Sequence, residues 1–322
     1  MAAAALAPSE FERLGFLMEA LAAAAALRTA TELGVLERLD KGPIAPGMLA
    51  RDQGITERAA ELLLAALAGV ALVERTVEGD YAAASEMGAV ARLVEHWSHL
   101  TEAVRDNRPV MRGDTPVGAE RAYPEIVDAL GAAFAKPAER VADNLARPGL
   151  RVIDIGAGAA PWGLALAGRY SDCEVTAVDL PAVLNNTRRA VRAAGLETQF
   201  RYVAGDFFSV DFGHSSHDLA VAGNICHLFD ESANRKLLAR LFETLRPGGC
   251  VALIDEVPNE RMDGPRGVVL YALGLLLRSG SGRAYPFTTY SGWLIDAGFE
   301  AVSRTEIDST GLVSLITARR PD

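Results

Sequence analysis

The stretch 151–180, RVIDIGAGAAPWGLALAGRYSDCEVTAVDL, decides the fold. The apolar run before the first glycine predicts a buried strand, and Gly156 and Gly158 predict a tight turn where backbone can approach a ligand closely. Pro161 suits the first turn of a helix, and the next strand ends at Asp179. A carboxylate at that strand tip can accept hydrogen bonds from two ribose hydroxyls, so the stretch predicts a nucleoside-binding unit.

A dinucleotide is the first alternative ligand, because its binding fold also places an acid about twenty residues after the glycines. The GxGxxG pattern fails here, since Pro161 stands where the third glycine is needed, and the turn carries no Lys or Arg. A nucleoside without phosphates is therefore favoured.

Two further strands fit the same α/β pattern. Residues 199–204 are followed by Gly205, Asp206 and Phe207, and a strand at 218–222 leads to Asn224. An acid followed by an aromatic residue can hold the adenine amino group and pack against its ring.

These residues resemble the first motifs of class I S-adenosylmethionine-dependent methyltransferases, in which an acid precedes x-Gly-x-Gly and a ribose acid ends the second strand. The resemblance implies a Rossmann-like α/β domain with a mostly parallel, seven-stranded sheet and S-adenosylmethionine as cofactor. Trp162, in the first helical turn, either contacts the cofactor or covers the core. The candidate cofactor-binding residues are Asp154, Gly156, Gly158, Trp162, Asp179, Leu180, Gly205, Asp206, Phe207 and Asn224.

Two later segments, ICHLFDESANRKLL (225–238) and LRPGGCVALIDEV (245–257), resemble the small-molecule O-methyltransferases of plants and of bacterial natural-product pathways. In that family a histidine after the fourth strand is the general base, and an acid ending the fifth strand orients it. His227 and Asp255 match without gaps, and Glu256 stands beside them as a second candidate. The resemblance thus implies O-methylation with His227 as base, in secondary metabolism.

Three departures from the family pattern keep other reactions open. Phe229 replaces a tryptophan, Ala160 replaces the third glycine of the loop, and a second carboxylate of the family falls near Ala284. The alternatives are C- or N-methylation and a non-methylating reaction on the same fold, such as a cyclisation, rearrangement or hydroxylation.

The acceptor site is predicted to be apolar. In the resembling family the region around residues 270–290 lines the acceptor cleft, and a helix over 124–145 would cap it. The candidate substrate-binding residues are Met111, Tyr123, Phe134, Tyr271 and Tyr285. A wide apolar pocket suits a flat aromatic or polyketide-like molecule.

The amino-terminal part is predicted to be helical. Residues Phe11–Leu39 are nearly all good helix formers, broken at Gly34, with apolar side chains on more than one face. Because such a helix must be buried on several sides, we expect it to pair two subunits in a homodimer. The resembling family has a dimerisation segment in the same region.

A short helix to Asp52, a helix after the N-cap candidate Thr56, and a hairpin from 72–75 and 80–83 then predict a winged helix. DNA binding is disfavoured, because the helix after Thr56 carries Glu57 and Glu61 and only one early basic residue. Acidic residues exceed basic ones, 42 to 32, for a net charge of −10, which also opposes binding to nucleic acid.

Length and composition bound the remaining expectations. At 322 residues, half of them apolar, the chain is predicted to form two domains, 1–105 and 106–322. We expect no apolar run to be long and charge-free enough to cross a membrane, and the alanine-rich start lacks the basic region of a signal peptide. Cys173, Cys226 and Cys250 have no metal-binding spacing, so we expect a cytoplasmic protein without a metal.

Overall fold

The computed structural model describes residues 10–84, 87–308 and 311–322, and the chain divides into two compact units after His99. The helix at 100–106 packs against the helix at 275–278 and therefore belongs to the second unit. This places the division slightly before the boundary at 105/106 that we expected from the sequence.

The first unit holds helices followed by a two-stranded hairpin. Its elements are α1 (Glu10–Glu32), α2 (Val35–Leu39), α3 (Pro46–Gln53), α4 (Glu57–Gly69), β1 (Val73–Arg75), β2 (Tyr81–Ala83) and α5 (Met87–Ser98). Gly34, at φ 67°, separates α1 from α2, and the Thr56 hydroxyl accepts a hydrogen bond from Ala59 N at the start of α4. The expected helix break, N-cap and antiparallel hairpin are thus confirmed.

Helix α1 contradicts one expectation. Over Glu12–Glu32 it is long and apolar enough to cross a membrane, judged by length and composition alone, with a mean hydropathy of 1.3. Its alanine-rich centre raises the hydropathy, and Glu19 and Arg28 are the only charged residues between 14 and 31. Only 6% of this stretch is buried within the chain, so a large apolar face is left exposed.

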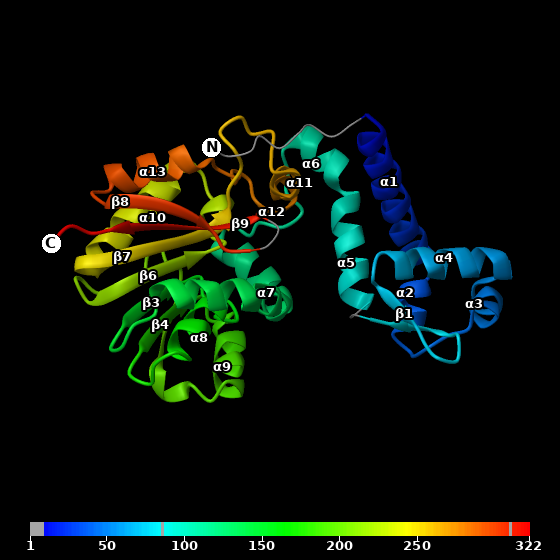
Figure 1. Ribbon diagram of the computed structural model, residues 1–322, viewed down its shortest axis with the longest axis horizontal. Coiled ribbons are helices and arrows are strands. Elements are labelled where there is room, and N and C mark those ends of the chain that lie inside the picture. Colours follow the sequence, from blue (N-terminus) through cyan, green and yellow to red (C-terminus); the bar gives the residue numbers. More distant parts are fainter. Residues whose placement is uncertain (1–9, 85–86, 309–310) are drawn as a thin grey trace. The chain divides into compact units, whose positions relative to one another are not determined.

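The second unit is an α/β fold around a seven-stranded sheet (Figure 1). Its helices are α6 (Leu100–Asp106), α7 (Pro116–Leu145), α8 (Pro161–Ala167), α9 (Leu184–Ala193), α10 (Glu231–Thr244), α11 (Arg266–Leu273), α12 (Leu275–Arg278) and α13 (Phe287–Asp296), with short 3-10 turns η1 (Glu197–Gln199) and η2 (Cys226–Leu228). Its strands are β3 (Arg151–Ile155), β4 (Glu174–Asp179), β5 (Phe200–Ala204), β6 (His217–Gly223), β7 (Leu245–Glu256), β8 (Glu300–Glu306) and β9 (Val313–Arg319).

The strand order is β5-β4-β3-β6-β7-β9-β8, and all neighbours from β5 to β7 are parallel, whereas β9 runs antiparallel to β7 and β8. Both faces are covered. Alternate residues of β3 point to opposite sides, so Val152 packs with α7 and α8 while Ile153 and Ile155 pack with α10 and α13. This is the mostly parallel seven-stranded sheet that the family resemblance implied.

Helix α7 begins earlier than the helix we expected over 124–145. The Thr115 hydroxyl accepts a hydrogen bond from Gly118 N, and Pro116 occupies the first turn, where its missing N–H costs nothing. Pro124, which we took as the helix start, lies inside α7 instead. The local cap at Thr115 therefore outweighs the usual tendency of proline to end a helix.

Candidate active site

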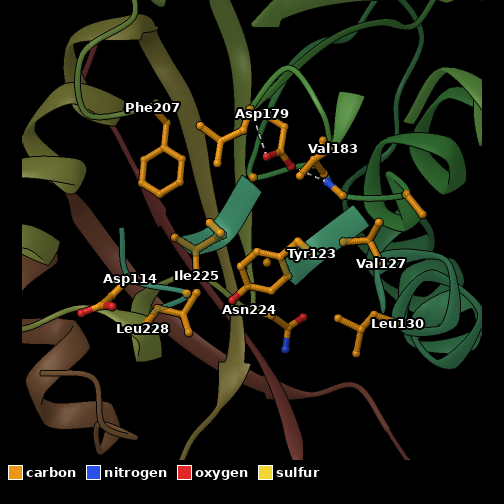
Figure 2. Close-up of a pocket in the computed structure, with 18 of the residues that line it drawn as sticks. Asp114, Tyr123, Val127, Leu130, Asp179, Val183, Phe207, Asn224, Ile225 and Leu228 are labelled. Atoms are coloured by element: carbon orange, nitrogen blue, oxygen red, sulfur yellow. Dashed lines mark hydrogen bonds between the residues drawn. The ribbon is translucent and has the colours of Figure 1, made fainter. Parts of the chain in front are cut away.

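The strand order reverses between the neighbouring strands β3 and β6. From β3 the chain continues to β4 on one side of this pair, and from β6 it continues to β7 on the other side. Ligands of open α/β sheets bind outside the carboxyl ends of the strands at such a point. A pocket of about 940 Å³, counting space open to solvent, lies there (Figure 2). The pocket is lined by residues 113–116, 119, 123, 127, 130–131, 134, 156–159, 161–162, 179–180, 183, 206–208, 223–225 and 228–229.

Asp179 ends β4 at the edge of this pocket. Its Oδ2 accepts a hydrogen bond from Gly158 N at 2.8 Å, and its Oδ1 accepts one from Leu180 N at 2.7 Å. A carboxylate offers about four lone-pair directions, so each oxygen keeps one for a further donor. Burial raises the pKa of Asp179 to about 6, although the two backbone N–H groups favour its ionised form. The group can therefore receive both hydroxyls of a ribose.

The glycine loop brings backbone close to the pocket. Gly156 has φ 62°, and a Cβ at this position would lie 2.3 Å from Ile225 Cδ1. A Cβ at Gly223, across the same edge, would lie 2.1 Å from the Trp162 indole nitrogen. No side chain fits at either position without displacing its neighbour, so these glycines are required by space.

Most of the predicted cofactor residues do line the pocket: Gly156, Gly158, Trp162, Asp179, Leu180, Asp206, Phe207 and Asn224. Trp162 covers the core, because it is 3% exposed and packs against Phe134 with ring centroids 5.6 Å apart. It also lines the pocket, and its contact with the cofactor stays a prediction. Together the acid at the ribose position, the glycine turn and the Asp206–Phe207 pair fit a nucleoside cofactor.

Two predicted cofactor residues lie elsewhere. Asp154 is fully buried, accepts a hydrogen bond from Gly163 N in α8, and does not line the pocket formed by the described residues. Burial raises its pKa to about 8, and its hydrogen bond from Gly163 N ties β3 to the start of α8. Gly205 has a φ of 142°, which side chains rarely allow, and a Cβ at this position would lie 2.5 Å from Val210 Cγ1. Both observations explain why this position is a glycine.

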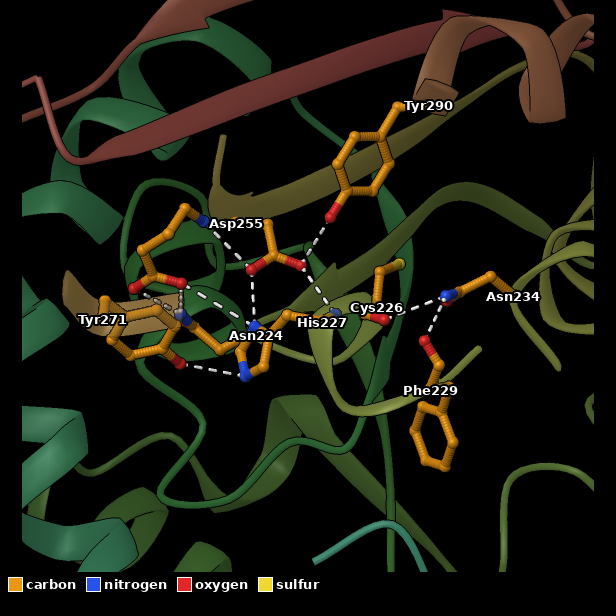
Figure 3. Close-up of polar contacts among 9 residues, drawn as sticks. Asn224, Cys226, His227, Phe229, Asn234, Asp255, Tyr271 and Tyr290 are labelled. Atoms are coloured by element: carbon orange, nitrogen blue, oxygen red, sulfur yellow. Dashed lines mark hydrogen bonds and ion pairs between the residues drawn. The ribbon is translucent and has the colours of Figure 1, made fainter. Parts of the chain in front are cut away.

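A buried polar cluster lies at the ends of β6 and β7 (Figure 3). His227 Nδ1 is 2.5 Å from Asp255 Oδ1, and Asp255 Oδ2 accepts a hydrogen bond from the backbone N–H of His227 at 3.1 Å. Glu256 is farther away, with Oε2 3.7 Å from Nδ1. The structure therefore brings Asp255, rather than Glu256, into contact with the imidazole.

The pKa values of the two carboxyl groups are shifted in opposite directions. Burial opposes ionisation of Asp255, but His227 and the surrounding hydrogen-bond donors outweigh it and lower the pKa of Asp255. Burial, followed by repulsion from Asp255, raises the pKa of Glu256 well above its usual value. The surroundings thus favour the ionised form of Asp255 and the protonated form of Glu256, whose carboxyl oxygens Asn224 Nδ2 contacts at 3.4 Å.

The same three side chains could also be considered as metal ligands, since their ligand atoms lie within 4.8 Å of one another. However, His227 Nδ1 and Asp255 Oδ1 are already at hydrogen-bonding distance, which leaves no room for a cation between them. The arrangement is that of an imidazole oriented by a carboxylate.

Tyr290 is a member of this cluster that our sequence reasoning did not select. Its hydroxyl donates a hydrogen bond to Asp255 Oδ2 at 2.9 Å, and its side chain is fully buried on α13. It belongs to the region around residues 270–290, which the family resemblance placed only near the acceptor cleft. Nothing in a single sequence pairs two residues 35 positions apart on different elements.

The predicted acceptor-binding residues separate into two groups. Tyr123 and Phe134 line the pocket, whereas Met111, Tyr271 and Tyr285 do not line it within the described residues. Tyr285 is a core residue whose hydroxyl donates to Phe229 O at 2.7 Å, which corrects our expectation. Met111 donates its backbone N–H to Leu277 O, and Tyr271 contacts His227.

His227, Asp255 and Glu256 themselves lie beneath this pocket rather than in its lining, as far as the described residues show. The imidazole is 3% exposed. The segment that carries it is fixed by Asn234, whose side-chain amide donates to Cys226 O at 2.9 Å and Phe229 O at 3.1 Å (Figure 3). The base candidate is thus held rigidly next to the cofactor pocket.

Comparisons with known proteins agree with this geometry. The model of the family described as O-methyltransferase domain matches residues 139–300. The 3-hydroxy-5-methyl-1-naphthoate 3-O-methyltransferase of Streptomyces sahachiroi is 30% identical over 307 residues, which cover 88% of each chain. The tetracenomycin polyketide synthesis 8-O-methyltransferase of Streptomyces glaucescens is 27% identical, covering 92% of this chain and 93% of the relative.

Among solved structures, the human N-acetylserotonin methyltransferase in complex with S-adenosylmethionine superposes with a TM-score of 0.73 at 22% identity, covering 99% of this chain and all of the other. This likeness shows the fold. The sequence matches go further: the chain belongs to the O-methyltransferase family, whose enzymes take the methyl group from S-adenosylmethionine.

Proposed function

We propose that this enzyme methylates a hydroxyl group on an apolar aromatic or polyketide-like small molecule of natural-product biosynthesis, with His227 as the general base. The observation that carries the proposal is the buried contact between His227 Nδ1 and Asp255 Oδ1 at 2.5 Å. The named activities of the two Streptomyces relatives, on a hydroxynaphthoate and in tetracenomycin synthesis, support this class of acceptor.

The chemistry follows from the tautomer of His227. With Nδ1–H donated to the Asp255 carboxylate, Nε2 is left as the basic nitrogen. A hydroxyl must lose its proton as its oxygen attacks the methyl group, and the Asp255 carboxylate stabilises the imidazolium that forms. S-adenosylmethionine supplies an electrophilic methyl group when bound at Asp179.

Incubation of the purified protein with methyl-labelled S-adenosylmethionine and a panel of hydroxynaphthoates and phenols tests this proposal. We expect label in the product ether, identified by mass spectrometry. Label on carbon or nitrogen would mean that the enzyme methylates that atom instead of an oxygen. Binding of the cofactor without any label transfer would favour a non-methylating reaction. The non-methylating reaction is kept as a second candidate because the fully buried Ala284 stands where the resembling family has a second carboxylate.

Tyr290 is proposed to position Asp255. We expect Tyr290→Phe to lower kcat about tenfold, because a hydrogen bond to the charged group is lost while the ring remains. The affinity for S-adenosylmethionine, measured by calorimetry, should stay unchanged. The acid limb of the pH profile of kcat should shift. An unaltered kcat would mean that Asp255 needs no support from this hydroxyl.

A second copy of the chain is the proposed partner of α1. Four of its large apolar side chains are more than half exposed within one chain: Leu14, Leu17, Met18 and Leu21. A contiguous apolar face of this kind marks an interaction surface. Pairing of two subunits through α1 would cover it without a membrane, in keeping with a cytoplasmic homodimer.

Removal of the residues before Gly42 should therefore yield protein that aggregates or is insoluble, because the partners of α1 within its own unit would also be uncovered. Light scattering of the full chain should report a dimer. A stable, folded monomer obtained from the truncated chain would contradict the proposed role of α1.

A further inference from the structure

The Tyr271 hydroxyl covers the basic nitrogen of His227. Tyr271 lies on α11, and its oxygen is 3.0 Å from His227 Nε2 (Figure 3). The two rings meet edge to face, with centroids 5.4 Å apart and an interplanar angle of 87°. Both nitrogens of the imidazole are thus engaged, one by Asp255 and one by Tyr271.

The direction of this hydrogen bond is set by its surroundings. Burial, and then the nearby Glu256, raise the pKa of Tyr271 well above its usual value, so its hydroxyl keeps its proton. With Nδ1–H directed at Asp255, Nε2 has only a lone pair to offer and must be the acceptor. Tyr271 is therefore the donor, and it holds His227 in the tautomer that general-base catalysis requires.

The ring of Tyr271 is also held in place. The Arg278 guanidinium lies 4.6 Å from the centroid of the Tyr271 ring. The His227 ring meets the same ring edge to face. The Tyr271 oxygen already occupies hydrogen-bonding distance of His227 Nε2. An acceptor hydroxyl must therefore either displace this oxygen or transfer its proton through it.

We propose that Tyr271 is a catalytic proton relay between the acceptor hydroxyl and His227. The proposal rests on the proposed role of His227 as general base. In the resembling family a second carboxylate stands where this chain has the buried Ala284. The Tyr271 relay would supply a second proton-transfer group near the imidazole in its place.

The proposed transfer moves two protons and one methyl group. The acceptor O–H proton moves to the Tyr271 oxygen while the original Tyr271 proton moves to His227 Nε2. The acceptor oxygen uses an electron pair to bond the methyl carbon. The carbon–sulfur bond of the methyl donor breaks, and its electron pair stays on sulfur. Tyr271 ends as a neutral phenol, and His227 ends as an imidazolium beside Asp255.

Tyr271→Phe tests the relay, with a hydroxynaphthoate that the wild-type enzyme methylates as acceptor. We expect kcat to fall about 10²-fold, the low end of the effect of an acid–base group, with unchanged affinity for S-adenosylmethionine. For 4-nitrophenol in its ionised form, which has no proton to transfer, the variant should retain the wild-type rate. When the wild-type rate is plotted against the fraction of D₂O, the points should lie below the straight line that joins the rates in H₂O and D₂O, as expected for two protons moving together.

Tyr202→Phe is the matched control, because it removes a tyrosine hydroxyl from β5, away from the cluster, under Arg188. Its kcat should match the wild type. If Tyr271→Phe keeps or exceeds the wild-type rate while His227→Ala loses it, the relay is wrong and the base stands. If His227→Ala also keeps the rate, the proposed function itself fails. A linear dependence on the D₂O fraction would likewise overturn the relay.

Discussion

His227→Ala should lower kcat for a hydroxyl acceptor by about 10²- to 10⁴-fold and leave the affinity for S-adenosylmethionine unchanged. The imidazole is the proposed base, it contacts Asp255, and it does not belong to the lining of the cofactor pocket as far as the structure describes the chain. Its loss should therefore remove proton transfer and not binding. Steady-state kinetics and calorimetry on the same preparation measure the two quantities.

Two results would lead to different conclusions. Turnover close to the wild type would mean that the acceptor arrives already ionised, or that carbon or nitrogen is methylated by proximity alone. Loss of cofactor binding together with activity would make His227 a structural residue. A partial recovery of the rate at higher pH with an acidic phenol would support its role as base.

Asp179→Ala should weaken binding of S-adenosylmethionine by about 1.5–3 kcal/mol, or about 10- to 150-fold in Kd, the scale of hydrogen bonds to a charged group. The carboxylate already accepts hydrogen bonds from Gly158 N and Leu180 N, so its removal also loosens the glycine loop. Calorimetry with the cofactor alone measures the effect. An unchanged Kd would assign the ribose hydroxyls to another group.

The pH dependence of the same binding has a defined sign. The pKa of Asp179 is raised to about 6, and only the ionised carboxylate offers acceptors for both hydroxyls. Affinity for S-adenosylmethionine should therefore be full well above pH 6 and fall as the pH decreases through about 6. Asp179→Asn, which does not titrate, is the matched control and should bind with the same affinity across this range.

The fold of the second unit could be predicted where local patterns specify it. The apolar run ending at Ile155, the glycine turn and the strand ending at Asp179 are contiguous, and the structure forms them as expected. The contact between His227 and Asp255 was also expected, because the two residues match without gaps the histidine and the acid of the resembling family.

The rest depends on packing between distant elements. Tyr271 and Tyr290 reach the cluster from α11 and α13, and the 44 and 35 residues that separate them from His227 and Asp255 carry no local signal for the contact. Asp154 shows the converse. Its position in the motif suggested a ligand, but its side chain is directed into the protein and accepts a hydrogen bond from α8.

The opposite pKa shifts of Asp255 and Glu256 bear on how charge moves in the proposed methyl transfer. The lowered pKa of Asp255 favours its ionised form and the raised pKa of Glu256 favours its protonated form, so negative charge concentrates on the carboxyl group that contacts His227. Under the proposed mechanism the bound methyl donor would bring a positive charge on sulfur, and His227 would hold that charge as an imidazolium after the transfer. Methyl transfer thus moves one positive charge from sulfur to nitrogen and leaves the total charge of the site constant. This total is conserved whatever the charge of Glu256. A protonated Glu256 leaves Asp255 as the carboxylate that faces the imidazolium, and Asp255 is already hydrogen-bonded in place before the charge arrives.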